Sequence, residues 1–241
     1  MAHVFNYKDS LDYQKWLENP RNKFSVNFEN ALMASMFKNL NGKTILDIGC
    51  GSGLSSISLI DNGFDVTGLE PSHHMINLAE KNLGKKAEIY LGFAEHLPFE
   101  DNYFDFVCLD KTLEFVEDPY QALFEAFRVA KNAVFIGFIN KYSLRALKIK
   151  INKFFENSVY DFANLFSLWE IKANAYKILG NVPIFWRTGF NKVFKKQIFS
   201  GFIGVVIIPV PRFKMYFETP NYKIKLALTC SSNLSVKNKK I

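Results

Sequence analysis

The chain has 241 residues, of which 49% are hydrophobic and 22% are charged. This length suits one domain with a sizeable core, and the composition excludes a wholly disordered chain. A net charge of +7 would suit nucleic acid, anionic lipid or an acidic substrate. The excess lies mainly in residues 141–153 and in lysines near residue 240, without an arginine cluster, so we interpret it as a solvated basic face.

Cysteines and apolar runs indicate the compartment. The three cysteines are far apart, without disulfide or metal-ligand spacing, which favours a reducing cytoplasm. The first ten residues lack the apolar stretch of a signal peptide, and the longest apolar run, residues 202–210, is too short to span a bilayer. These features lead us to expect a soluble cytoplasmic protein. The four histidines form no ligand pattern, so we expect no metal.

The first 140 residues alternate between strand and helix patterns. Two helices are expected in residues 10–17 and 27–40, before an Asn-Gly turn. Short apolar runs then predict strands at residues 44–48, 64–69, 87–91, 104–109 and 134–139. Helical patterns lie between them, one of them from the strong start Asp118-Pro119 to about residue 131. This alternation predicts an α/β fold with a parallel sheet covered on both faces.

The alternation of strand and helix patterns ends after residue 140. Residues 141–180 are expected to be mostly helical and are rich in aromatic side chains. Strand-like runs at residues 182–188 and 202–210 predict an antiparallel pair at the edge of the sheet. Because no repeat or low-complexity linker is present, we expect one domain with an insertion after the fifth strand.

A glycine-rich run follows the first predicted strand, and this strand–turn–helix arrangement is suited to a polar nucleotide. Asp47 precedes the glycines, where a carboxylate can receive an ammonium group but disfavours a dinucleotide pyrophosphate. Glu70 ends the next strand, where a carboxylate accepts hydrogen bonds from ribose hydroxyls. The Lys-Ser/Thr pair of nucleoside triphosphate sites is missing.

The run LDIGCGSG at residues 46–53 resembles the first motif of class I S-adenosylmethionine-dependent methyltransferases. Four further segments resemble that family's later motifs in order: residues 70–79, 92–99 (GFAEHLPF), 104–119 and 128–131. The resemblance covers roughly residues 44–140. A weaker one links Tyr13, Trp16, Pro20 and Glu29 to the opening of a bacterial subgroup.

The resemblance implies a Rossmann-like, seven-stranded, mostly parallel sheet with an antiparallel edge strand. It also implies S-adenosyl-L-methionine as cofactor and S-adenosyl-L-homocysteine as product. The expected parts of the domain are an N-terminal helical lid, a cofactor-binding core, a helical substrate insertion, and terminal strands with a tail, at residues 1–40, 41–140, 141–180 and 181–241.

The resemblance also assigns cofactor-binding residues. It places the methionine part at the glycine-rich turn and the ribose at the end of the second strand. Asp110, which ends the fourth strand, is expected to meet the methionine part through its backbone. The full predicted set is Asp47, Gly49, Cys50, Gly51, Gly53, Glu70, Pro71, Phe93, Ala94, Glu95 and Asp110.

Two positions depart from the family pattern. Phe93 stands where the family usually has an aspartate that contacts the adenine amino group. Phe93 can pack against the ring instead, with the Ala94 N–H facing a ring nitrogen and Glu95 as a substitute acceptor. Phe115 replaces the family's usual histidine after Glu114, so a catalytic role of that histidine in other members does not carry over.

Catalytic and substrate residues are weakly indicated. His74 and Tyr13 are the candidates for catalysis, although His74 also suits an ordinary first helical turn. Tyr13 and Trp16 share a helical face, which suits either a lid or packing on the core. Asn140 and Trp169 are further substrate candidates. The aromatic residues of the insertion favour an apolar or aromatic acceptor.

Three functions remain open. Methyl transfer to a small molecule, without a metal, is the first. An RNA or protein methyltransferase is encouraged by the charge, but the sequence contains neither a catalytic Asn-Pro-Pro-Tyr motif nor a basic stripe with interleaved aromatics. A cofactor-binding but catalytically silent subunit is the third, because of Phe93 and Phe115. A nicotinamide-dependent oxidoreductase is disfavoured by Asp47. The sequence does not indicate an oligomeric state.

Overall fold

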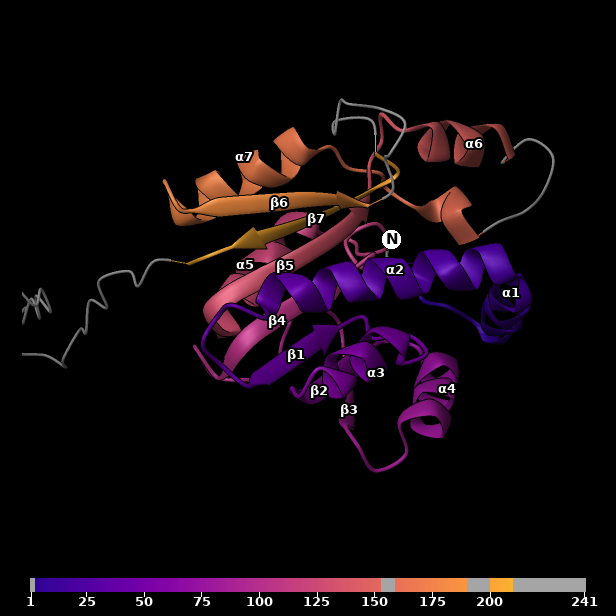
Figure 1. The fold of residues 1–241 in the computed structure, drawn as a ribbon, viewed down its shortest axis with the longest axis horizontal. Coiled ribbons are helices and arrows are strands. Elements are labelled where there is room, and N and C mark those ends of the chain that lie inside the picture. Colours follow the sequence, from indigo (N-terminus) through magenta and orange to yellow (C-terminus); the bar gives the residue numbers. More distant parts are fainter. Residues whose placement is uncertain (1–2, 153–158, 190–199, 210–241) are drawn as a thin grey trace, which may run out of the picture. The chain divides into compact units, whose positions relative to one another are not determined.

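The computed structural model describes residues 3–152, 159–189 and 200–209. In them, seven strands form one sheet with the order β3-β2-β1-β4-β5-β7-β6 (Figure 1). The strands are β1 (Thr44–Ile48), β2 (Asp65–Glu70), β3 (Glu88–Leu91), β4 (Phe104–Asp110), β5 (Ala130–Ile139), β6 (Ile184–Gly189) and β7 (Phe202–Ile207). The first five are parallel, and β7 pairs antiparallel with both β5 and β6. The predicted fold class is confirmed.

Helices cover both faces of the sheet, so its central strands are buried on both sides. On one face, α2 (Pro20–Phe37) and α3 (Leu54–Asp61) enclose a core with Ile45, Phe106 and Phe135. On the other face, α5 (Pro119–Val129) and α7 (Leu168–Leu179) pack on the residues that alternate with these along the strands. α4 (His73–Leu83) lies beside α3, near β3.

Local signals explain where the helices begin. Asp118 accepts hydrogen bonds from the backbone N–H groups of Tyr120 and Gln121, and Pro119 is the first residue of α5, as predicted. The same logic starts α2, which Asn19 caps ahead of Pro20. α1 (Tyr7–Glu18) starts at Asn6 with a capping box. Both N-terminal helices begin earlier than predicted, because Asn6 and Asn19 cap them ahead of the apolar residues.

Two predicted boundaries differ from the structure. α5 ends at Val129 and β5 begins at Ala130, so this strand starts four residues before the predicted one. The predicted helical insertion divides into α6 (Leu144–Asn152), a short 3-10 helix η1 (Val159–Phe162) and α7. α7 is a layer of the main fold, because Ile171, Ala175 and Ile178 belong to the core beneath α5. The part of the insertion near the strand ends is therefore α6 with η1.

Within the described ranges, the structure has no helix with the length and apolar character needed to cross a membrane. The predicted tail after residue 209 lies outside the described residues.

Candidate cofactor and acceptor site

The turn between β1 and α3 requires glycine. Gly49, Gly51 and Gly53 have φ angles of +68°, +56° and +80°, in the left-handed region. A Cβ atom on Gly49 would lie 2.6 Å from the Thr112 side chain. A Cβ atom on Gly51 would meet no atom closer than the Met75 side chain at 3.5 Å, so the space beside Gly51 is open. The turn thus presents bare backbone to the space above the strand ends.

Glu70, at the end of β2, closes one side of this turn. Its carboxylate accepts hydrogen bonds from the Gly51 N–H and the Ser72 N–H, each at 3.0 Å. The side chain is buried, and burial raises the pKa of Glu70 to about 7. A hydrogen bond therefore links Glu70, the second predicted acid, directly to the glycine-rich turn.

Asp47 does not reach the space above the turn, where it could contact a ligand directly. Its carboxylate accepts hydrogen bonds from Ser55 Oγ at 2.7 Å and Ser56 Oγ at 2.6 Å, at the start of α3. Its other oxygen, Oδ1, is buried and has no hydrogen-bond partner among the described residues. Burial raises the pKa of Asp47 to about 6. Asp47 lies behind the turn and is not part of the cavity lining.

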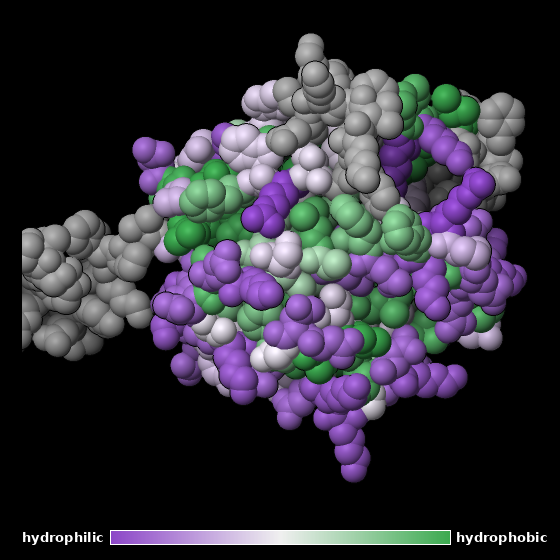
Figure 2. Space-filling model, in the orientation of Figure 1, coloured by the Kyte–Doolittle hydropathy of each residue, from purple (hydrophilic) through white to green (hydrophobic). Residues whose placement is uncertain are grey.

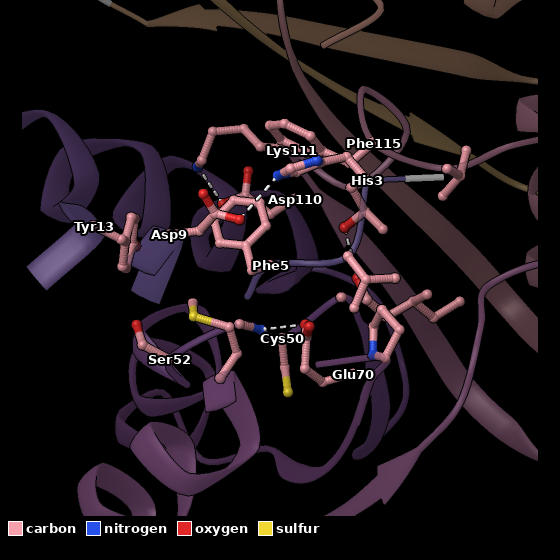
Figure 3. Close-up of a pocket in the computed structure, with 18 of the residues that line it drawn as sticks. His3, Phe5, Asp9, Tyr13, Cys50, Ser52, Glu70, Asp110, Lys111 and Phe115 are labelled. Carbon is pink, nitrogen blue, oxygen red and sulfur yellow. Dashed lines mark hydrogen bonds and ion pairs between the residues drawn. The ribbon is translucent and has the colours of Figure 1, made fainter. Parts of the chain in front are cut away.

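A cavity of about 900 Å³ opens above the turn (Figure 3). The volume is near the upper end of the range for small-molecule sites, roughly 300–1,000 Å³. The predicted cofactor residues that line it are Gly49, Cys50, Gly51, Glu70, Pro71, Phe93, Ala94, Glu95 and Asp110. Gly53, like Asp47, does not line it, and a Cβ there would lie 2.8 Å from Leu83.

The segment after β3 forms the cavity wall opposite the turn. Phe93 is half-exposed and Ala94 is buried, and both face the cavity. Glu95 is already engaged, because its Oε1 accepts hydrogen bonds from the N–H groups of Glu117 at 2.8 Å and Asp118 at 3.3 Å. Glu95 therefore anchors the loop before α5, and a role as adenine acceptor would have to use its other oxygen.

The N-terminal segment covers the cavity. Tyr13 and Trp16 of α1 both line it, with their rings stacked at a centroid distance of 5.9 Å. Burial raises the pKa of Tyr13. Two hydrogen bonds fix the segment before α1 to the rest of the protein. The His3 N–H donates to the Phe115 carbonyl at 3.0 Å, and Ser72 Oγ donates to the Phe5 carbonyl. The predicted lid segment therefore contributes to the cavity lining.

His3 was missed by the sequence reasoning. Its ring lines the cavity and stacks on Phe162 at 4.3 Å, and its Nε2 lies 3.1 Å from Asp9 Oδ2 (Figure 3). The ring also lies 6.5 Å from the Phe115 ring. An imidazole from the N-terminus thus stands beside the position where the family usually has its histidine. No local pattern indicates this, because the two positions are 112 residues apart.

A charged cluster at the end of β4 was also missed. Lys111 Nζ contacts Asp110 and lies 3.0 Å from Glu29 Oε2, and Arg145 lies 2.6 Å from the other Glu29 oxygen. Burial alone would lower the pKa of Lys111, but the carboxylates of Asp110 and Glu29 raise it well above its usual range. Lys111 also has a left-handed φ of 56°, a strained conformation that often marks functional sites. Lys111 and Tyr160 of η1 line the cavity.

Three predicted residues lie away from the cavity. His74, on the outer side of α4, pairs edge-on with Tyr7 at 5.7 Å. Asn140 is buried, and its side chain bonds the Ser200 carbonyl and the Tyr142 N–H. Trp169 is exposed at the start of α7 and packs against Tyr142. None of the three lines the cavity.

No group of histidine, cysteine, aspartate and glutamate side chains in the described part of the chain could hold a metal ion.

The comparisons with known proteins agree with this fold. Residues 46–136 match a family described as a methyltransferase domain. A demethylmenaquinone methyltransferase of Lactobacillus johnsonii is 30% identical, over 66% of this chain and 69% of its own length. The next four relatives are matched over only 36% to 46% of their length.

Solved structures show the same fold. A methyltransferase of Thermotoga maritima, described as a possible histamine N-methyltransferase, has a TM-score of 0.65 and 24% identity, covering 84% of this chain and 97% of its own. Magnesium protoporphyrin IX methyltransferase of Synechocystis, solved with bound S-adenosylhomocysteine, has a TM-score of 0.59 and 19% identity, covering 85% of this chain and 96% of its own.

Fold, turn and cavity together define a nucleotide-type cofactor site at the carboxyl ends of a parallel sheet. The chain belongs to the class I S-adenosylmethionine-dependent methyltransferases, and its cofactor is S-adenosyl-L-methionine. The residues present fit this cofactor, because the turn is free of side chains at Gly51 and a buried carboxylate, Glu70, lies beside it.

Proposed function

We propose that the enzyme methylates a small-molecule acceptor that binds under the N-terminal lid. The observation that carries this proposal is the single cavity shared by the cofactor turn and the lid. Its lining includes residues of α1 and of the segment before it, and such a partly enclosed cavity favours a small acceptor over a folded RNA or protein. The Lactobacillus johnsonii relative is named for a quinone, which supports the same class of acceptor.

In this proposal the cofactor lies along the turn. Glu70 accepts hydrogen bonds from the ribose hydroxyls, and the backbone of Gly49 to Gly51 holds the methionine part. Phe93 packs against the adenine, with the Ala94 N–H toward a ring nitrogen. Asp47 acts from behind, by fixing the start of α3 through Ser55 and Ser56.

The cofactor supplies an already activated methyl group. The protein therefore has to align the acceptor with it and exclude water. Tyr13 and Trp16 exclude water from above. The acceptor end of the cavity is lined by Phe5, Phe115 and Phe162, which suits an apolar or aromatic acceptor.

His3 is placed to take a proton from the acceptor. With its Nε2 held by Asp9, the Nδ1 lone pair is the basic position of the ring. Tyr13 also lines the cavity, whereas His74 does not. We therefore propose His3, ahead of the two sequence-based candidates, as the general base for acceptors that carry an acidic O–H or N–H.

Calorimetric titration tests the cofactor site. We expect S-adenosylhomocysteine to bind in the micromolar range and NAD not to bind. Tight NAD binding without binding of S-adenosylhomocysteine would reverse the assignment.

A second experiment tests the acceptor class. The enzyme and methyl-labelled S-adenosylmethionine are added to an extract of the host, which is then separated into small molecules, RNA and protein. We expect label in the small-molecule fraction. Label confined to RNA or protein would refute the proposal, and no label in any fraction would favour a catalytically silent subunit.

A further inference from the structure

The outer face of α6 is apolar. Leu144, Leu147 and Ile151 have exposed fractions of 70%, 52% and 49%. Their spacing of three and four residues places them in one stripe along the helix. The opposite side faces the protein, where Ala146 is fully buried and Arg145 reaches Glu29 at 2.6 Å. The helix thus directs a charged contact inward together with Ile149, and exposes three large aliphatic side chains, which is unusual for a surface helix.

Positive charges flank this stripe. At about 100° per residue, Lys148 and Lys150 fall on opposite sides of it, and both are exposed. Residues 144–152 (LRALKIKIN) contain no acidic residue. Figure 2 shows hydrophobic residues with hydrophilic ones beside them at the upper right, where Figure 1 places α6.

The stripe lies near the acceptor end of the cavity. α6 contacts η1, whose residues Tyr160 and Phe162 line the cavity. Phe162 is 62% exposed although it also stacks on His3. This ring therefore stands at the rim, between the cavity and the surface on which the stripe lies.

We propose that α6 docks on the surface of an anionic lipid bilayer. Leu144, Leu147 and Ile151 enter the boundary between headgroups and acyl chains, while Lys148 and Lys150 extend to the phosphates. A helix with an apolar stripe and a basic flank on each side matches this environment. A stable protein interface buries about 800 Å² on each partner, more than a narrow stripe on a helix of nine residues offers, so a lipid surface is the better match.

Docking would bring the cavity rim to the bilayer. An apolar acceptor could then pass from the lipid to the methyl group without crossing water. Only this consequence rests on the proposed function; the docking itself does not depend on methyl transfer.

Vesicle co-sedimentation with the full chain tests the proposal. The probes are phosphatidylcholine vesicles with and without phosphatidylglycerol. We expect binding to the anionic vesicles that weakens with salt. Lys148→Glu with Lys150→Glu should weaken it at least about thirty-fold, since one lysine near such a surface contributes about five-fold. Leu144→Ser with Leu147→Ser and Ile151→Ser should abolish binding although it leaves every lysine in place.

Matched changes elsewhere serve as controls. Leu91→Ser alters a leucine of similar exposure, 53%, at the end of β3, and Lys85→Glu with Lys86→Glu alters two exposed lysines. The leucine control should leave binding unchanged, and the lysine control should weaken it far less than the α6 charge variant. Titration with S-adenosylhomocysteine shows that each variant is folded and separates failure of docking from failure of the cofactor site.

Three outcomes would overturn the proposal. The first is that the wild-type chain does not bind anionic vesicles, and the second is that the serine variant binds them equally well. The third is that the serine change alters the oligomeric state in sedimentation velocity while vesicle binding is absent, which would assign the stripe to contact with another copy of the chain.

Discussion

At the scale of single residues, the site depends on how each carboxylate is held. Glu70 is satisfied by two backbone N–H groups and stays at the cavity surface. Asp47 is satisfied by two serine hydroxyls and stays behind the turn. The two acids that the sequence analysis both assigned to the cofactor are therefore held differently: Glu70 lines the cavity, and Asp47 supports the start of α3 from behind the turn.

Glu70→Gln should weaken binding of S-adenosylhomocysteine by roughly 10- to 100-fold, because the change removes a charged hydrogen-bond acceptor in a buried position. Isothermal titration calorimetry measures this. Glu88→Gln alters an exposed carboxylate on β3 and serves as the control. A dissociation constant of Glu70→Gln within two-fold of the wild type would refute the assigned role.

His3→Gln should lower the rate of methyl transfer roughly 100-fold or more, the usual contribution of a general base. The measurement is the rate of label transfer into small molecules. Binding of S-adenosylhomocysteine should not change, and His74→Gln is the matched control. An unchanged rate of transfer would exclude His3 as the base.

At the scale of elements, Glu29 connects three parts of the fold. From α2 it reaches Lys111 after β4 and Arg145 on α6. These contacts fix the helix that carries the apolar stripe to the strand end that forms the cavity floor. Removal of one partner from a buried charge network costs far more than the network adds to stability, because charges are left uncompensated.

Glu29→Gln should therefore lower the free energy of unfolding by about 3 kcal/mol. Urea denaturation followed by circular dichroism measures this loss. The exposed Glu80→Gln on α4 should change it by less than about 0.5 kcal/mol. A loss equally small for Glu29→Gln would mean that these contacts do not stabilise the fold.

At the scale of the whole molecule, buried acids make stability depend on pH. Glu114 is fully buried; the Ile139 N–H donates to its Oε1 at 2.9 Å, and its Oε2 has no partner among the described residues. Burial raises the pKa of Glu114 from 4.5 to about 7. The folded state therefore binds a proton more tightly than the unfolded state, and this group's contribution to stability falls as pH rises from about 4.5 to about 7.

Glu114→Gln should remove the loss of stability that Glu114 causes as pH rises. Between pH 5 and pH 8 the variant should gain stability relative to the wild type, by on the order of 3 kcal/mol at most. Thermal or urea unfolding at several pH values measures the difference. Asp105→Asn is a useful contrast, because hydrogen bonds from Lys43 and Thr44 lower the pKa of Asp105. A constant difference across this range would mean that Glu114 is already ionised in the folded protein.

Most of the fold could be predicted from the sequence, because strands, caps and turns leave local patterns. Five apolar runs separated by helical periodicity specify a parallel sheet, and Asp118-Pro119 specifies the start of α5. The boundary at Ala130 could not be predicted, since β5 begins there by pairing with Phe104 of β4. That pairing involves a residue distant in the chain and leaves no local pattern.

The proximity of the predicted cofactor residues could also be expected from the sequence. Gly49, Gly51 and Glu70 belong to one continuous strand–turn–helix–strand segment whose geometry is local. The acceptor half was decided by tertiary structure. His3 reaches Phe115, and Glu29 joins Lys111 to Arg145, only because packing brings the N-terminal segment, α2 and α6 over the same strand ends. The sequence by itself determined the class of fold and the cofactor. The packing of distant segments decided which side chains surround the proposed acceptor site, because such contacts depend on three-dimensional distance and not on spacing along the chain.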